Sequence, residues 1–179
     1  MYQIEVLRNI SEKMLRQLLA IREIAFSKDW REYEDAKEFY TAEIANPENI
    51  ALIFEKGEEL AGFLLAMPHN VIQVELVADD PQMQVDDHCF YIETMQVDPE
   101  IQKSLAGGRI FFRMLKMLFV EAEKHGINRF SMHARVNTGL SEAAQRGFGK
   151  MIKEVRRIEK WKWNGNEPAD YLSGVYEKE

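Results

Sequence analysis

The 179-residue sequence has little of what marks metal sites, disulfide scaffolds or nucleic-acid binding. It contains one cysteine, Cys89, which excludes an internal disulfide. Its four histidines show no metal-ligand spacing such as HExxH. We therefore expect no structural metal. The formal net charge of −7 repels nucleic acid and anionic membranes, so we expect neither as a partner.

Long apolar runs and low-complexity segments are also missing. The longest apolar run, at 60–67, is far shorter than the roughly 20 residues that a membrane-spanning helix needs. The first residues alternate apolar with charged side chains and do not follow the pattern of a secretory signal, which predicts a cytoplasmic protein. No Pro-rich or Gly/Ser-rich break divides the chain, so we expect one domain over residues 1–179.

Hydrophobic periodicity predicts alternating groups of strands and helices. Ser11 offers an N-cap to the first helix, residues 56–58 form a hairpin turn, and Gly126 ends the longest helix. The long connection at 68–88 contains a possible strand at 71–76. The other expected strands and helices are strand 2–9, helices 14–27 and 33–44, strands 50–54, 60–67 and 89–97, helix 108–125, strand 129–136, helix 138–146, and strands 151–163 and 170–177. This order predicts an α/β or α+β fold with a mixed sheet.

Three landmarks follow one another in the second half of the chain. Val97-Asp98-Pro99 ends a strand, Asn137 follows another strand, and Gly147-Phe148 follows a short helix. With the glycine-containing segment between the first two, the run 91–148 resembles the core of the GNAT superfamily of N-acetyltransferases. The resemblance implies a mostly antiparallel central sheet flanked by helices. It also implies transfer of an acetyl group from acetyl-coenzyme A to a primary amine by direct attack on the thioester.

The segment before the long helix suits a phosphate. A helix N-terminus presents unpaired N–H groups and the positive end of its dipole to an anion. Gly107 and Gly108 would let the backbone approach a pyrophosphate closely, and Lys103, Arg109 and Arg113 could add positive charge. The other interpretation is that two glycines merely allow a loop to turn into a helix. The spacing of this segment also departs from the family's pattern.

Two side chains are candidates for acid–base chemistry. An alkyl amine has a pKa near 10, so some group must take its proton before or during attack. Tyr91 and Glu93 share one face of the strand that leads to Val97, and by the resemblance that face looks into the acceptor site. We expect Glu93 to be the general base, directly or through a water, and Tyr91 to be an acceptor contact or proton relay. An ion pair for Glu93 and aromatic packing for Tyr91 remain alternatives, with His133 as a second possible base.

The remaining roles come from the resemblance alone. The backbone N–H of Met95 would hold the thioester oxygen, Val97 would pair with the pantetheine arm, and Asn137 would contact the coenzyme. Asn137 could equally be a helix N-cap. Ala143 stands where many family members have a tyrosine that protonates the leaving thiolate.

Substitution of that tyrosine leaves a second hypothesis open, a non-catalytic acyl-coenzyme A-binding or sensor module with the same fold. A third is an interaction protein that uses the sheet and the acidic segment 79–87. For an enzyme, we expect a neutral or cationic small-molecule or peptide amine as acceptor, because five acidic residues between 75 and 87 should border the acceptor side. The last strands of such folds often pair between subunits, which allows a homodimer.

Overall fold

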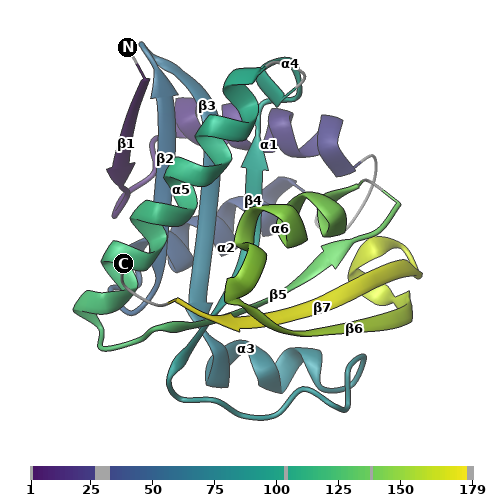
Figure 1. Ribbon diagram of the computed structural model, residues 1–179. Helices are drawn as coiled ribbons and strands as arrows, with labels where there is room; N and C mark the ends of the chain where they lie inside the picture. Colours follow the sequence, from purple (N-terminus) through teal and green to yellow (C-terminus); the bar gives the residue numbers. More distant parts are fainter. Residues whose placement is uncertain (1, 27–32, 103–104, 138, 177–179) are drawn as a thin grey trace. The chain divides into compact units, whose positions relative to one another are not determined.

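The computed structural model describes residues 2–26, 33–102, 105–137 and 139–176. Its seven strands have the order β1-β2-β3-β4-β5-β7-β6, with helices against the sheet (Figure 1). The pair β4–β5 is parallel, whereas β1–β2, β2–β3, β5–β7 and β6–β7 are antiparallel. This confirms the predicted mixed, mostly antiparallel fold class. Within the described ranges, no helix has the length and hydropathy needed to cross a membrane.

The chain divides into two compact units. The first unit comprises Met1–Ala66 and Thr94–Glu121, and the second comprises Met67–Glu93 and Ala122–Glu179. Whether these units fold as the single domain expected from the sequence stays a prediction.

The first unit contains a three-stranded antiparallel arrangement and two helices that follow its first strand. Its elements are β1 (Tyr2–Val6), α1 (Glu12–Phe26), α2 (Tyr33–Ala45), β2 (Ile50–Lys56), most of β3 (Glu59–Pro68), the end of β4 (Cys89–Val97), α4 (Pro99–Gln102) and most of α5 (Leu105–Lys124). The N–H of Met14 donates to Oγ of Ser11 at 3.2 Å, which confirms the expected N-cap. β2 and β3 form the predicted hairpin, with Lys56 opposite Glu59.

Aromatic and aliphatic side chains fill the core of this unit. Tyr40 of α2 meets Phe63 of β3 edge to face, with ring centroids 5.7 Å apart. Leu15 and Leu18 of α1 are almost completely buried, as is Phe54 of β2. Burial of each such side chain contributes about 1.5–3 kcal/mol, so packing of the amphipathic helices stabilises this unit.

The second unit contains a three-stranded antiparallel group at the end of the chain. Its elements are α3 (His69–Leu76), the start of β4, β5 (Arg129–Arg135), α6 (Leu140–Phe148), β6 (Ile152–Trp161) and β7 (Glu167–Val175), with short 3-10 turns at Gly149–Met151 and Lys162–Asn164. Phe148 of α6 stacks on Phe130 of β5 with centroids 4.2 Å apart. Gly126 ends α5 at φ +71°, and the bonds Ile127 N–H to Ala122 and Gly126 N–H to Glu123 form a Schellman motif.

Residues 71–76 and the start of α5 are two places where the structure differs from the sequence prediction. Residues 71–76 belong to helix α3 and not to a strand, because Ile72 and Leu76 are buried at helical spacing while Val71 and Val74 are exposed. Short apolar runs leave this choice open in a sequence. Helix α5 begins at Leu105, so Gly107 and Gly108 lie in its first turn and not in a preceding loop.

Candidate functional site

The parallel ladder between β4 and β5 is short. It joins Cys89–Tyr91 to Arg129–Ser131, although β4 continues to Val97 and β5 to Arg135. Tyr91 is therefore the last ladder residue of β4, and Glu93 follows it two positions later. Period two puts the side chains of Tyr91 and Glu93 on the same face of the strand, as the sequence predicts.

Tyr91 begins a chain of buried polar side chains in the second unit. Its hydroxyl lies 2.9 Å from Nδ1 of His133, and Nε2 of His133 lies 3.1 Å from Oδ2 of Asp80. The side chains of His133 and Asp80 are each about 1% exposed. Arg156 of β6 donates to both oxygens of Asp80, at 2.6 and 2.7 Å. Four residues from four separate segments thus form one network, which we call the Tyr91–Arg156 network.

Aromatic rings fix the imidazole at the centre of this network. Trp161 stacks on His133 with ring centroids 3.8 Å apart and planes 13° apart. The ring of Tyr171 also contacts the His133 ring, with ring centroids 5.2 Å apart. The guanidinium carbon of Arg156 lies 4.7 Å from the centroid of the Tyr171 ring. The His133 ring therefore has little freedom to rotate, and its hydrogen-bond directions are set by the fold.

The protonation states follow from burial and contacts. Burial opposes ionisation of Asp80, but hydrogen bonds from His133 and Arg156 outweigh it and hold its pKa well below the ordinary value. Burial lowers the pKa of His133 against the opposing effect of Asp80, so the imidazole is neutral at pH 7. Because an ionised carboxylate only accepts, His133 donates through Nε2 and accepts the Tyr91 hydroxyl through Nδ1. Burial and the charge of Glu93 raise the pKa of Tyr91.

These states refine the roles of the two predicted catalytic residues. The Tyr91 phenol stays protonated and directs its hydrogen to His133, which leaves its oxygen lone pairs as acceptors. It can contact an acceptor molecule but is a poor base. Glu93 is half-buried, and its charge acts on Tyr91, so the two side chains belong to one local site. His133 is committed to Asp80 and Tyr91, which makes it a positioning residue.

The coenzyme-binding residues expected in the first unit lie on β4 and α5. Met95 is 8% exposed and Val97 is half-buried at the end of β4. Gly107 and Gly108 lie in the first turn of α5, and a Cβ added at Gly108 would meet no atom within 4 Å. Arg109, the next residue, is exposed. Gly108 therefore faces open space, and the exposed cation Arg109 follows it in the sequence, which suits an anion such as pyrophosphate.

The structure gives separate information on the other residues that the sequence assigned to the coenzyme or the leaving thiolate. Lys103 lies outside the described residues. The guanidinium of Arg113 lies 5.4 Å from the Phe54 ring centre. Asn137 is exposed, and the N-cap of α6 is Gly139, so the N-cap interpretation of Asn137 is wrong. Ala143 lies on α6, half-buried.

The acidic residues at 75–87 are less available than their sequence suggests. Asp80 is neutralised by Arg156, Asp86 pairs with Arg129 at 3.0 Å, and Asp87 accepts from Asn70. Arg129 and Arg156 therefore weaken the attraction of Asp86 and Asp80 for a distant cation, whereas the neutral amide of Asn70 leaves the charge of Asp87 in place. Sequence periodicity could not reveal this, because the partners Arg129 and Arg156 come from β5 and β6.

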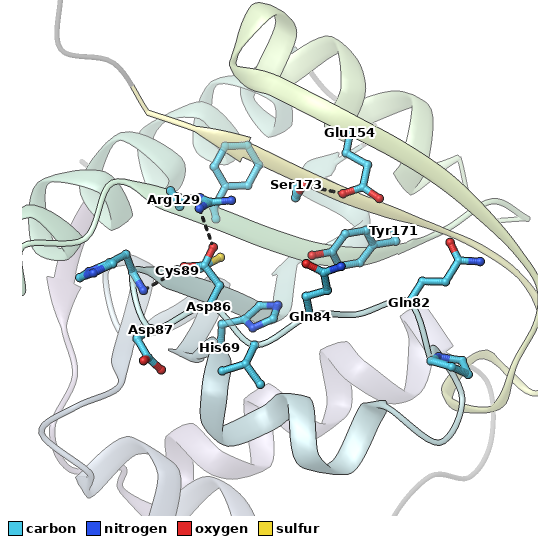
Figure 2. Close-up of a pocket in the computed structure, with 14 residues that line it drawn as sticks. His69, Gln82, Gln84, Asp86, Asp87, Cys89, Arg129, Glu154, Tyr171 and Ser173 are labelled. Carbon is cyan, nitrogen blue, oxygen red and sulfur yellow. Dashed lines mark hydrogen bonds and ion pairs between the residues drawn. The ribbon is translucent and has the colours of Figure 1, made fainter.

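A polar pocket opens in the second unit beside this acidic segment (Figure 2). Its volume is about 700 Å³, and its lining includes His69, Asp86, Cys89, Glu154 and Tyr171. Burial raises the pKa of the Cys89 thiol to about 12, so Cys89 is no thiolate nucleophile at neutral pH.

Sequence reasoning missed Asp80 and Arg156 of the Tyr91–Arg156 network, and also Trp161, which stacks on its histidine. Asp80 was only one member of the acidic segment 79–87, and sequence reasoning assigned no functional role to Arg156 or Trp161. No local signal marks them. Gln96 was also missed, and it is buried on β4 with no hydrogen-bond partner for either side-chain amide atom among the described residues.

Comparison with known proteins identifies solved structures that have a similar fold. No family model and no curated protein sequence matches the chain. Among solved structures, the ribosomal-protein-S18-alanine N-acetyltransferase of Escherichia coli matches with TM-score 0.63 and 17% identity over 100% of this chain and 97% of its own. An aminoglycoside 6'-N-acetyltransferase complexed with coenzyme A matches with TM-score 0.68 and 16% identity, covering 99% and 98%.

A third match is a Desulfovibrio desulfuricans protein assigned to the GNAT family of acetyltransferases, with TM-score 0.67 and 9% identity, covering 99% of each chain. Identities this low speak for the fold and not for the substrate. The chain therefore has the fold of the GNAT N-acetyltransferases along nearly its whole length.

Proposed function

We propose that this protein transfers an acetyl group from acetyl-coenzyme A to a primary amine of a small molecule or peptide. The observation that carries the proposal is the position of Glu93, half-buried and two residues beyond the end of the β4–β5 ladder, beside a hydroxyl fixed by the Tyr91–Arg156 network. The fold likeness to acetyltransferases supports the same reaction class.

The residues of the chain suit an acyl-coenzyme A. The open first turn of α5, with Gly107, Gly108 and Arg109, would receive the pyrophosphate. Backbone groups of Met95 and Val97 would bind the thioester oxygen and the pantetheine arm, and Asn137 would contact the coenzyme. The coenzyme supplies an activated acetyl thioester when bound.

Glu93 would start the reaction by accepting a proton from the ammonium group of the acceptor. An amine with a pKa near 10 arrives mostly protonated at pH 7, so this step controls the supply of nucleophile. The lone pairs of the Tyr91 oxygen would orient the amine, since its hydrogen is already given to His133. The N–H of Met95 would stabilise negative charge on the thioester oxygen during attack.

Because Ala143 has no proton to donate, the coenzyme thiol would leave as a thiolate without help from an acid at this position. A thiol with a pKa near 8.5 is a tolerable leaving group in its ionised form. This arrangement allows catalysis, although it also keeps the non-catalytic binding module as the second candidate function.

A mass-resolved screen of pooled amines with acetyl-coenzyme A distinguishes the candidates. Acetylated product together with consumption of acetyl-coenzyme A would support the enzyme and identify the acceptor class. Coenzyme binding without turnover across small amines and peptide N-termini would favour the binding module. Failure to bind the coenzyme would contradict both and leave the interaction protein.

A further inference from the structure

The polar pocket of the second unit lies at the start of β4 and β5, away from Glu93. Cys89 and Arg129 are the first residues of these strands, and Glu93 lies four residues farther along β4. At about 3.3 Å per residue, that separation is roughly 13 Å. A volume of about 700 Å³ is in the range of small-molecule sites. Neither the acceptor nor the coenzyme roles proposed above use this pocket.

One nitrogen of a buried imidazole in the lining of this pocket has no hydrogen-bond partner among the described residues. His69, the first residue of α3, is 1% exposed, and its Nδ1 has no hydrogen-bond partner among the described residues. Figure 2 shows its ring between Asp86 and Gln84, toward the interior of the pocket. A buried polar atom left unpaired lowers stability, so a ligand that supplies the missing bond is favoured.

The charges around the pocket select the sign of that ligand. Its lining contains three carboxylates, Asp86, Asp87 and Glu154, and one guanidinium, Arg129. Arg129 is already paired with Asp86 at 3.0 Å. Arg156 also reaches Glu154 at 3.4 Å, but its charge is balanced by Asp80. Negative charge is therefore in excess.

The state of His69 agrees with a donor ligand. Burial lowers the pKa of His69, so the ring is neutral at pH 7 and has one nitrogen free to accept. An inorganic cation is disfavoured, because no group of three or more His, Cys, Asp or Glu side chains among the described residues could hold a metal ion. An ammonium group has three N–H donors and a single positive charge.

We propose that this pocket binds a small organic ammonium ion, with its N–H groups donated to His69 and to the carboxylates of Asp86 and Glu154. The carbon chain of the ligand would lie along Tyr171 and the stem of Gln84. The site is independent of the acetyl-transfer reaction.

Nuclear magnetic resonance of the intact protein tests this directly. The probes are n-butylammonium and 1,4-diaminobutane, with n-butanol and butyrate as neutral and anionic isosteres. We expect the two amines alone to shift the His69 imidazole resonances, and to lower the pKa of His69 further because two positive charges repel. Binding of n-butanol as tight as that of n-butylammonium would overturn the proposal, as would unshifted His69 resonances at millimolar amine.

A matched pair of variants separates the site from general surface charge. Glu154→Gln removes a pocket carboxylate, whereas Glu159→Gln removes an exposed carboxylate of the same strand that does not line the pocket. We expect Glu154→Gln to weaken n-butylammonium binding about tenfold at low salt, and Glu159→Gln to leave it unchanged. Equal weakening by both variants would contradict a specific ammonium site.

Discussion

Asp80 and His133, 53 residues apart in the sequence, meet through Oδ2 and Nε2 at 3.1 Å with both side chains about 1% exposed. This contact joins the connection after α3 to β5 and fixes the tautomer of the histidine that holds Tyr91. Arg156 then compensates the buried carboxylate. The arrangement gives the second unit a polar interior whose members depend on one another.

Loss of the Asp80 charge should destabilise the protein strongly. Asp80→Asn leaves the guanidinium of Arg156, which is 17% exposed, with only the exposed carboxylate of Glu154 as an ionic partner. Removal of one member of a buried ion pair costs about 3–5 kcal/mol, and partial exposure of Arg156 points to the lower end. Urea unfolding at pH 7 measures the change. Asp79→Asn, one residue away and half-exposed, is the control and should cost less than about 0.5 kcal/mol.

Stability should fall as the solution becomes mildly acidic. Burial lowers the folded-state pKa of both His69 and His133, so the unfolded chain binds more protons than the folded chain below about pH 6.5. Each histidine can then remove up to about 1.4 kcal/mol per pH unit, down to its folded-state pKa. Below about pH 4, protonation of Asp80 in the unfolded chain removes more.

Denaturant unfolding at intervals between pH 7.5 and pH 5 measures how the free energy of unfolding changes with pH. His133→Gln should reduce the dependence of the unfolding free energy on pH by up to about 1.4 kcal/mol per pH unit, which corresponds to one proton. This holds whatever the effect of the variant on absolute stability. A slope that stays the same in the variant would show that His133 does not titrate between the two states in this range.

Glu93→Gln should slow acetyl transfer without weakening coenzyme binding. The amide keeps the size of the side chain but cannot accept the proton, so turnover should fall by roughly 10²–10⁴ at neutral pH. Part of the rate should return toward pH 10, where more of the amine arrives deprotonated. Steady-state rates across pH test this, with Glu167→Gln, exposed at the start of β7, as the matched control. Equal rates in folded Glu93→Gln would remove Glu93 from the mechanism and leave the proton to bulk water.

Substitutions at Gly108 should separate folding from coenzyme binding. A Cβ there meets no protein atom, and alanine is favoured over glycine inside a helix by about 1 kcal/mol, so Gly108→Ala should be neutral or stabilising in thermal melts. Gly108→Val should weaken acetyl-coenzyme A binding measured by calorimetry, because its branches obstruct a pyrophosphate at the helix start. Unchanged affinity in Gly108→Val would place the phosphates elsewhere.

Much of the local structure could be predicted from sequence, because its causes are local. The Ser11 cap, the hairpin around Gly57 and the end of α5 at Gly126 each depend on a few neighbouring residues. The period-two relation of Tyr91 to Glu93 is equally a property of one strand. The prediction of a strand at 71–76 was wrong, because a short apolar segment can form a strand or a helix and only its packing partners decide between them.

Tertiary structure alone decided the electrostatics of the candidate site. The sequence determines that Asp80, His133 and Arg156 can ionise, but not that they meet, because they come from segments that only folding brings together. In the folded protein Asp80 is a buried carboxylate compensated by Arg156 and not an acidic surface charge. His133 is a positioning residue and not a second base. Burial and partner distance set a group's pKa, and both are properties of the fold and not of the residue type.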